Sequence, residues 1–425
     1  LPDPLPPGER ESPPLASAPR AGPALEPEQR PPFAQRARGM LPLAVPWSLM
    51  CAAAAAALVK GIVEPGQLFV HLLTFFLAMP AGVVLHELGH WGLGSLVGAH
   101  TLLVTIGEGR LLWEGRWGQT ILRWHEVPFS GANAPAFGEG HWPRLRMWLS
   151  TLGGPLANVL LAGASLWLGW YGVALANGLL AAVNLVPFRS SSQFASRAWN
   201  DGGQLMTIPF YSDAEVRLRR ADSVAFLGGL ERDYGNDVRA EHQFRRALAI
   251  APQNRNARLD LGKRCLEKGE LAEARALFED LANEALTERM RTVVLALLSL
   301  VYLLQGGPLL EHAQARVEEA LALDPRAPLA VGIWAAIQVR RGRAPEALAA
   351  FRVAFGELRG DSGVQHSWVR GALLCFQAEA LASLGRPGQA QASLRAAEIL
   401  CQSGTVCGPA RAAIGGAPAW LGLDE

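Results

Sequence analysis

The stretch His-Glu-Leu-Gly-His at residues 86–90 places two imidazoles and a carboxylate close together. On a helix, positions i and i+4 lie on the same face, so His86 and His90 can bind one zinc ion. The glutamate between them, Glu87, can accept a proton from water activated by that ion. The spacing therefore predicts one Zn²⁺ per chain, with His86 and His90 as ligands and Glu87 as the catalytic base.

The hydrophobic surroundings of this motif distinguish it from chance occurrences on soluble helices. In the whole segment 67–99, the only ionisable groups are His71, His86, Glu87 and His90. A charged side chain at the centre of a bilayer costs about 2.5–3.5 kcal/mol even on a lenient scale. Three ionisable groups so close together on one predicted helix therefore need a compensating partner, and a bound zinc ion supplies one.

Two histidines leave a further zinc ligand to be supplied from elsewhere in the chain. Glu108 and Glu114 follow His90 near the spacing of one zincin pattern, but both fall in a segment patterned like strands. His100 lies at the predicted membrane boundary, where a histidine is usually interfacial. Asp201 follows the last hydrophobic stretch. The residues alone leave these four candidates open.

Long uncharged stretches predict that residues 41–210 cross a membrane. Residues 41–59 carry no charged side chain, and neither do residues 147–188, a stretch more than twice as long. One crossing takes about 20 apolar residues, so the longer stretch is enough for two. A large soluble core is the alternative, but uncharged stretches of this length seldom occur in one. The predicted transmembrane helices are 41–60, 67–98, 147–168 and 173–188.

Positively charged residues predict the orientation of these helices. Ten arginines flank the helix ends that would share one side, whereas Lys60 stands alone on the other side. Cytoplasmic flanks carry the excess of Lys and Arg, so the amino terminus, the loop 100–146 and everything after residue 189 should be cytoplasmic. His86 lies about 28 Å along its helix, at about 1.5 Å per residue. The histidines are thus expected near the cytoplasmic face, on the same side as Asp201.

The loop between the second and third predicted helices has a pattern of its own. Residues 102–124 alternate apolar and polar side chains around two glycine-containing turns. This alternation predicts a β-hairpin. The tryptophans of the segment suit the membrane interface.

A sequence repeat with a period of about 34 residues begins near residue 220. Ala240 and Phe244 recur one period later as Ala274 and Phe278. Further copies are Ala313-Val317-Ala320, Ala347-Phe351-Ala354 and Ala390-Leu394-Ala397. The spacing resembles the second helix of tetratricopeptide repeats, in which small alanines let paired helices approach and the aromatic ring fills the gap between pairs. A non-repetitive helical bundle is the alternative.

The remaining composition excludes some classes of protein. Residues 1–40 are rich in proline and hold few apolar side chains, so they are predicted to be disordered and too polar for a signal peptide. The net charge of +1 argues against nucleic acid as a partner. Five scattered cysteines do not form a disulfide framework. Cys401 and Cys407 could pair, but free thiols in a reducing compartment are expected.

Three motifs together resemble the site-2 protease family of intramembrane zinc metalloproteases. They are HELGH at residues 86–90, GGPLAN at 153–158, and NLVPF at 184–188 followed by Asp201-Gly202. The resemblance covers about residues 80–210. It implies that His86, His90 and Asp201 are zinc ligands and that Glu87 is the catalytic base. The gap between Asn184 and Asp201 is longer than the family's usual spacing.

These observations predict an all-α membrane protein with about four transmembrane helices and a small β-hairpin insertion, followed by a cytoplasmic α-solenoid of tetratricopeptide type. The predicted domains are a disordered tail (1–40), a transmembrane zinc metalloprotease domain (41–210), a repeat domain (220–400) and a flexible tail (401–425). Gly153 and Gly154 are expected to let helices pack closely. Asn158 and Asn184 lie within hydrocarbon, where they either support the packing or hold substrate.

The predicted function is hydrolysis of peptide bonds in membrane-protein substrates, close to the cytoplasmic face of a bacterial plasma membrane. In this interpretation the repeats recruit the substrate or a protein regulator. The alternative is a catalytically silent scaffold, anchored in the lipid bilayer, whose repeats bind a protein or peptide.

Overall fold

The computed structural model describes residues 64–190, 198–358, 364–400 and 404–415. The predicted disordered tail and the first predicted transmembrane helix lie outside these residues. The chain divides into two compact units, with the boundary between Leu227 and Gly228. Each unit is described by itself.

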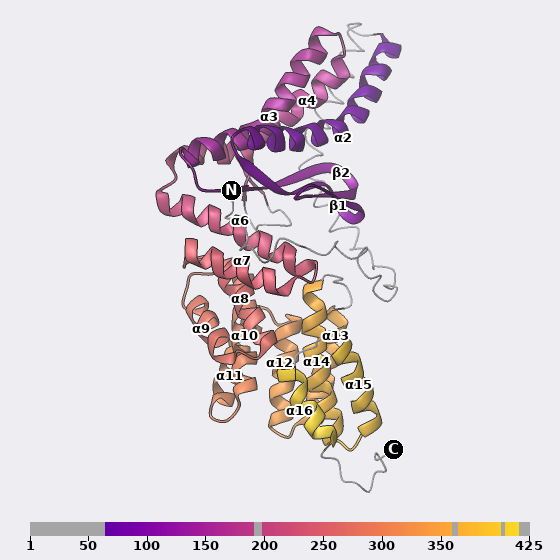
Figure 1. The fold of residues 1–425 in the computed structure, drawn as a ribbon. Coiled ribbons are helices and arrows are strands. Elements are labelled where there is room, and N and C mark those ends of the chain that lie inside the picture. The colour runs from indigo at the N-terminus through magenta and orange to yellow at the C-terminus, as the bar shows by residue number, and fades with distance from the viewer. Residues whose placement is uncertain (1–63, 191–197, 359–363, 401–403, 416–425) are drawn as a thin grey trace. The chain divides into compact units, whose positions relative to one another are not determined.

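The first unit is built on three apolar helices, α2 (Pro65–Leu96), α3 (Pro143–Trp167) and α4 (Tyr171–Leu185), which pack against one another (Figure 1). Both α2 and α3 begin with proline, which is well tolerated at the first helical position. Two helices, Gly66–Leu96 and Pro143–Trp167, are long and apolar enough to cross a membrane, with mean hydropathies of 2.2 and 1.3. The third, α4, is shorter and ends at Leu185, before the predicted boundary at residue 188.

The predicted hairpin is present and longer than expected. Strands β1 (Ala99–Trp117) and β2 (Thr120–Phe137) pair antiparallel around a turn at Gly118, and the register shifts at several positions. The part of β1 nearest α2 is buried, and Val104 and Ile106 pack there against Val83 of α2. The hairpin therefore covers the same helix that carries the HELGH motif.

The segment after α4 returns to the end of that helix. Strands β3 (Arg189–Ser190) and β4 (Ala198–Trp199) pair antiparallel, and α5 (Asp201–Thr207) follows at once. A short 3₁₀ helix, η1 (Ile208–Phe210), leads into α6 (Asp213–Asp233), within which the boundary between the units falls.

The second unit consists of helices packed mainly as sequential pairs. They are α7 (Asp237–Ile250), α8 (Arg255–Lys268), α9 (Leu271–Ala282), α10 (Glu288–Gln305), α11 (Leu309–Leu323), α12 (Pro328–Arg340), α13 (Ala344–Leu358), α14 (Val364–Ser383), α15 (Pro387–Leu400) and α16 (Gly404–Gly415). Every Ala, Phe, Val and Leu position quoted for the repeat is buried.

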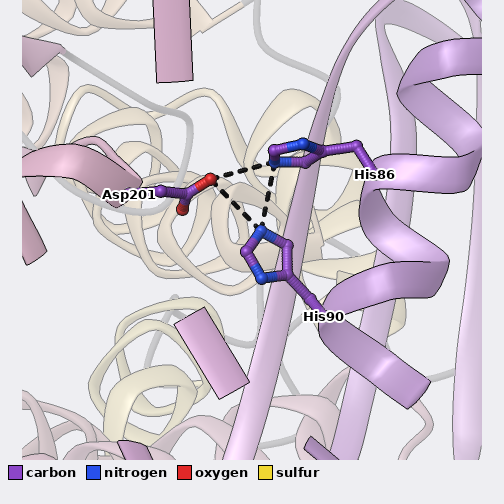
Figure 2. A group of neighbouring side chains, drawn as sticks. All are labelled: His86, His90 and Asp201. Atoms are coloured by element: carbon purple, nitrogen blue, oxygen red, sulfur yellow. Dashed lines mark hydrogen bonds and ion pairs between the residues drawn. The ribbon is translucent and has the colours of Figure 1, made fainter. Parts of the chain in front are cut away.

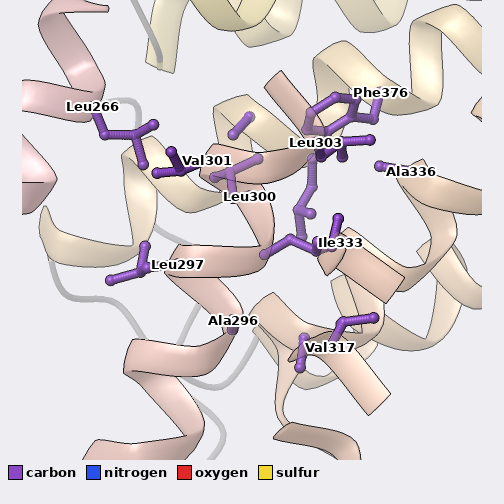
Figure 3. Packing of buried hydrophobic residues seen from close by; sticks show 14 of the residues in the cluster. Leu266, Ala296, Leu297, Leu300, Val301, Leu303, Val317, Ile333, Ala336 and Phe376 are labelled. Carbon is purple, nitrogen blue, oxygen red and sulfur yellow. The ribbon is translucent and has the colours of Figure 1, made fainter. Parts of the chain in front are cut away.

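The packing inside the pairs explains the repeat. A Cβ at Gly228 would lie 2.6 Å from the Phe244 ring, and a Cβ at Gly262 would lie 2.6 Å from the Phe278 ring. A glycine in one helix thus makes room for the aromatic ring of the next. Leu297, Ile333 and other large apolar residues continue one core through the unit (Figure 3). The repeat region is a solenoid-like array of helix pairs of tetratricopeptide type, as predicted.

The expectation of free thiols is wrong for one pair of cysteines. Cys375 of α14 and Cys407 of α16 form a disulfide with Cα atoms 5.3 Å apart. The last helix packs on α14 and brings together two cysteines that are distant in sequence, a tertiary contact that cysteine spacing does not reveal. Cys407 is therefore not free to pair with Cys401, which lies outside the described residues. Cys265 is free and buried.

Candidate metal centre

Three side chains converge on one point between α2 and α5 (Figure 2). Asp201 Oδ2 lies 2.9 Å from His86 Nε2 and 3.3 Å from His90 Nε2, and the two nitrogens are 3.1 Å apart. At Zn–N distances of about 2.0–2.1 Å, tetrahedral ligand atoms lie about 3.3–3.4 Å apart. The three donors are therefore spaced almost as a zinc ion would hold them.

Hydrogen bonds fix the orientation and the tautomer of His86. Asn158 of α3 donates its amide to Gly82 O at 3.0 Å and to Asn177 Oδ1 at 2.9 Å. Its Oδ1 therefore accepts, at 2.7 Å, from His86 Nδ1. With the proton on Nδ1, the lone pair of Nε2 points toward His90 and Asp201. Asn158 and Asn177 are both fully buried.

His90 is held in the same way by a backbone carbonyl. Its Nδ1 lies 2.9 Å from Ser150 O on α3, which can only accept, and 3.3 Å from Gly154 N, which can only donate. The shorter contact favours the proton on Nδ1 and the lone pair on Nε2. Two lone pairs and a carboxylate oxygen then face one another in a buried place. Such a donor set fits a cation, and the outer hydrogen bonds are those that commonly orient zinc-bound histidines.

Glycines allow the helices to approach at this level. A Cβ at Gly154 would lie 2.4 Å from His90 Nε2 and 2.7 Å from His86 Nε2. A Cβ at Gly153 would lie 2.2 Å from Gly89 O. Gly153 thus serves the close packing that the sequence predicts, whereas Gly154 also borders the donor atoms themselves.

The carboxylate of Glu87 lies close enough to His86, His90 and Asp201 to interact electrostatically with all three, but it is not one of the three candidate metal ligands. Its side chain is buried, and Oε2 has no hydrogen-bond partner within the described part of the chain. The backbone of Gly131 on β2 lies against the carboxylate, since a Cβ there would be 2.3 Å from Oε1. A buried carboxylate with a free oxygen next to a metal site is placed to hold water and to take its proton.

The structure does not bring the other candidate residues to this point. Glu114 pairs with Arg123 on the hairpin at 2.7 Å, and Glu108 and His100 are exposed. Asn184 donates its side-chain amide to Leu180 O in its own helix at 3.0 Å. The contribution of Asn177 was missed from the sequence, because it depends on the packing of α4 against α3.

Among the described residues, one other group could offer three ligand atoms, Cys265, Glu270 and Glu273. Its carboxylates are already neutralised, because Arg245 binds Glu273 at 2.7 Å and Lys268 binds Glu270 at 2.7 Å. Burial, together with the negative charge of Glu273, raises the pKa of the Cys265 thiol to about 12. Zinc binds the thiolate, so this group is the poorer metal site.

An HExxH helix that shares a buried centre with an aspartate, among apolar helices, defines the class of membrane-embedded zinc-dependent metalloproteases. The model of Peptidase family M50 matches residues 74–339, which is more than half of the chain. The chain therefore belongs to Peptidase family M50, the site-2 protease family, and is a metalloprotease. Members of this family are membrane-embedded and zinc-dependent.

The chain is also similar to several solved structures, each at low identity. A thermophilic TPR protein from Thermus thermophilus is 20% identical, with a TM-score of 0.34 over 46% of this chain and 98% of that chain. YrrB, a TPR protein with an unusual peptide-binding site, is 16% identical, with a TM-score of 0.27 over 45% and 91%. The APC/C heterotetramer Cut9–Hcn1 is 15% identical, with a TM-score of 0.36 over 66% and 57%. The comparison with curated protein sequences found no match.

Proposed function

We propose that this chain is an intramembrane zinc metalloprotease that hydrolyses peptide bonds of membrane-protein substrates near the cytoplasmic face. The observation that carries the proposal is the convergence of His86, His90 and Asp201 on one point, with the free carboxylate oxygen of Glu87 beside it. We assign the first three residues as ligands of one zinc ion and Glu87 as the catalytic base.

The roles of the residues follow from their positions. A bound zinc ion would lower the pKa of water to about 7 and polarise the peptide carbonyl. Glu87 would take the proton of the attacking water and pass it to the amine that leaves. Asn158 would keep His86 in the tautomer that binds metal, which favours a supporting role over contact with substrate. For Asn184 we propose a supporting role, because its backbone carbonyl accepts a hydrogen bond from the Asn200 side chain at 3.0 Å.

The substrate must present an accessible carbonyl. In an α-helix each carbonyl accepts a hydrogen bond from the residue four positions later. A membrane-spanning substrate helix therefore has to unwind where it is cut. We place this step near the cytoplasmic side because ten arginines flank that side of the predicted helices, against one lysine on the other.

We propose a multi-pass protein of a bacterial plasma membrane, and the same charge count supports an amino terminus and repeats in the cytoplasm. The disulfide in the repeat unit speaks against this side, because such bonds are uncommon in a reducing compartment. We propose the domain boundaries predicted from the sequence, with the protease in 41–210 and the repeats in 220–400. The repeats would recruit the substrate or a protein regulator, since arrays of helix pairs offer extended binding surfaces.

The test is cleavage of a membrane-spanning reporter helix by the full chain in lipid vesicles. Glu87→Gln should lower the cleavage rate at least about 100-fold, because proton transfer by a positioned base contributes about 10²–10⁴-fold. It should also keep zinc near one per chain. Glu126→Gln, the same change at an exposed hairpin position, should cleave like the wild type.

Two results would contradict the proposal. Equal cleavage by the wild type and by Glu87→Gln would remove the catalytic base. If the purified wild type held no zinc, the second candidate function, a catalytically silent membrane-anchored scaffold, would be favoured. The size of the repeat array is the observation that supports this second candidate.

A further inference from the structure

The long gap between Asn184 and Asp201 is closed by a small backbone ladder. Arg189 pairs with Trp199 and Ser190 pairs with Ala198, and Asn200 N donates to Phe188 O at 3.0 Å. The chain therefore comes back beside the point at which it left α4. The described residues on the two sides of the gap, 188–190 and 198–200, thus lie side by side.

The side chain of Asn200 joins the two helices that meet here. Its amide nitrogen reaches carbonyl oxygens at the end of α4, at 2.7 Å from Val186 O and 3.0 Å from Asn184 O. Its Oδ1 accepts from Phe188 N at 3.0 Å and from Gly203 N at 3.1 Å. The last bond is the N-terminal cap of α5. One side chain thus satisfies free carbonyls of one helix and a free N–H of the next.

The packing around this side chain leaves α5 little freedom. A Cβ at Gly202 would lie 2.1 Å from Leu185 O, and a Cβ at Gly203 would lie 2.4 Å from the Trp199 ring. The guanidinium of Arg189 lies 4.5 Å from the centre of the same ring. The first turn of α5 is thus seated directly on the end of α4, and Asp201 is the first residue of that turn.

We propose that Asn200 is a positioning residue that places the Asp201 carboxylate at the metal centre, and that it compensates for the stretched spacing of the third motif. The proposal rests on the proposed function, because it takes Asp201 as a zinc ligand. Asn200 itself lies beside the ligand and acts through it, by fixing the start of α5 against α4.

The test is zinc affinity of the full chain, measured by competition with a chelator. Asn200→Ala should weaken zinc binding about 10–100-fold, as loss of a residue that orients a metal ligand usually does. Asn200→Asp keeps the acceptor for Gly203 N but loses the N–H groups that donate to α4. Its zinc affinity should therefore lie between that of the wild type and that of Asn200→Ala. The matched control is Asn254→Ala, which removes an equivalent cap from α8, bonded to Ala257 N at 2.8 Å. It should bind zinc like the wild type.

A double-mutant cycle separates positioning from general damage. If Asn200 acts through Asp201, then Asn200→Ala should change zinc affinity little in a chain that already carries Asp201→Ala. An equal loss in both backgrounds, or wild-type affinity of Asn200→Ala, would overturn the proposal. Should Asn200→Ala fail to fold, wild-type affinity of Asn200→Asp would overturn it instead. If the wild type bound no zinc, the zinc site itself would be overturned. If the wild type bound zinc and the Asn200 variants bound it equally well, only the positioning role of Asn200 would be overturned.

Discussion

At the residue scale, the proposed metal centre depends on the absence of a side chain at Gly154. A methyl group at this position would lie too close to the Nε2 atoms of both His86 and His90. On the same helix, a Cβ at Gly163 would meet nothing within 4 Å. The two glycines therefore offer a matched comparison between a position that borders the ligands and one that is open.

We expect Gly154→Ala to lose zinc, because the new Cβ must displace His86 or His90 from its hydrogen bonds. Gly163→Ala should keep zinc near one per chain. Elemental analysis of the two purified variants checks this expectation. Full zinc occupancy in Gly154→Ala would show that the imidazoles lie elsewhere.

How far the sequence predicted these residues depends on how local their contacts are. His86, Glu87 and His90 share one helix, so their spacing alone predicted the motif. Asp201 needed a resemblance to a family, and its approach to the histidines depends on how α5 is seated. Asn177 and Gly131 were not predicted, because each meets the site through a contact between different elements.

At the element scale, the crossing of α2 and α3 sets the distance between the histidines and the residues that orient them. The helix backbones meet at Gly89 and Gly153, where a Cβ on Gly89 would lie 2.3 Å from Gly153 O. Small residues at such crossings are typical of membrane helices. One turn later, a Cβ at Gly92 would meet nothing within 4 Å.

We therefore expect Gly89→Ala to destabilise the first unit by about 1–3 kcal/mol, the usual cost of overpacking. Zinc affinity should fall with it, because the carbonyl that holds His90 belongs to α3. Gly92→Ala should change neither. Thermal unfolding in detergent, followed with and without added zinc, measures both effects, and equal midpoints for the two variants would contradict the close crossing.

The length of the uncharged stretches predicted the presence of the helices better than the residues at which they end. The helix that carries the motif and the one after it are long and apolar, as expected, whereas α4 ends at Leu185 because the chain turns there toward β3. The alternating pattern predicted the hairpin but not its length. Its register also shifts at several positions, which alternation does not encode.

At the scale of the whole molecule, the chain divides into two compact units, each with buried clusters of its own. In the second unit, Phe244, Phe278 and Phe351 of the repeat are fully buried. The period of the repeat predicted this core, because each copy repeats the same contact. The bond between Cys375 and Cys407 was not predicted, since it joins the end of the array to an earlier helix.

We expect Phe278→Ala to destabilise the repeat unit by about 3–5 kcal/mol, the usual cost of removing a buried phenylalanine. Zinc per chain should stay at the wild-type value, because each unit has buried clusters of its own. Hydrogen exchange of α8 and α9, measured beside the zinc content, tests both parts. The exposed Val238 provides the control as Val238→Ala, and loss of zinc from Phe278→Ala alone would show that the units depend on each other.

The strand that passes Glu87 has a consequence for chemical control of the enzyme. At Gly131 there is no room for even one methyl group beside the carboxylate. The backbone of β2 therefore closes one side of Glu87, the residue proposed as the catalytic base. A compound designed to bind this carboxylate must therefore approach Glu87 from a side that β2 does not cover.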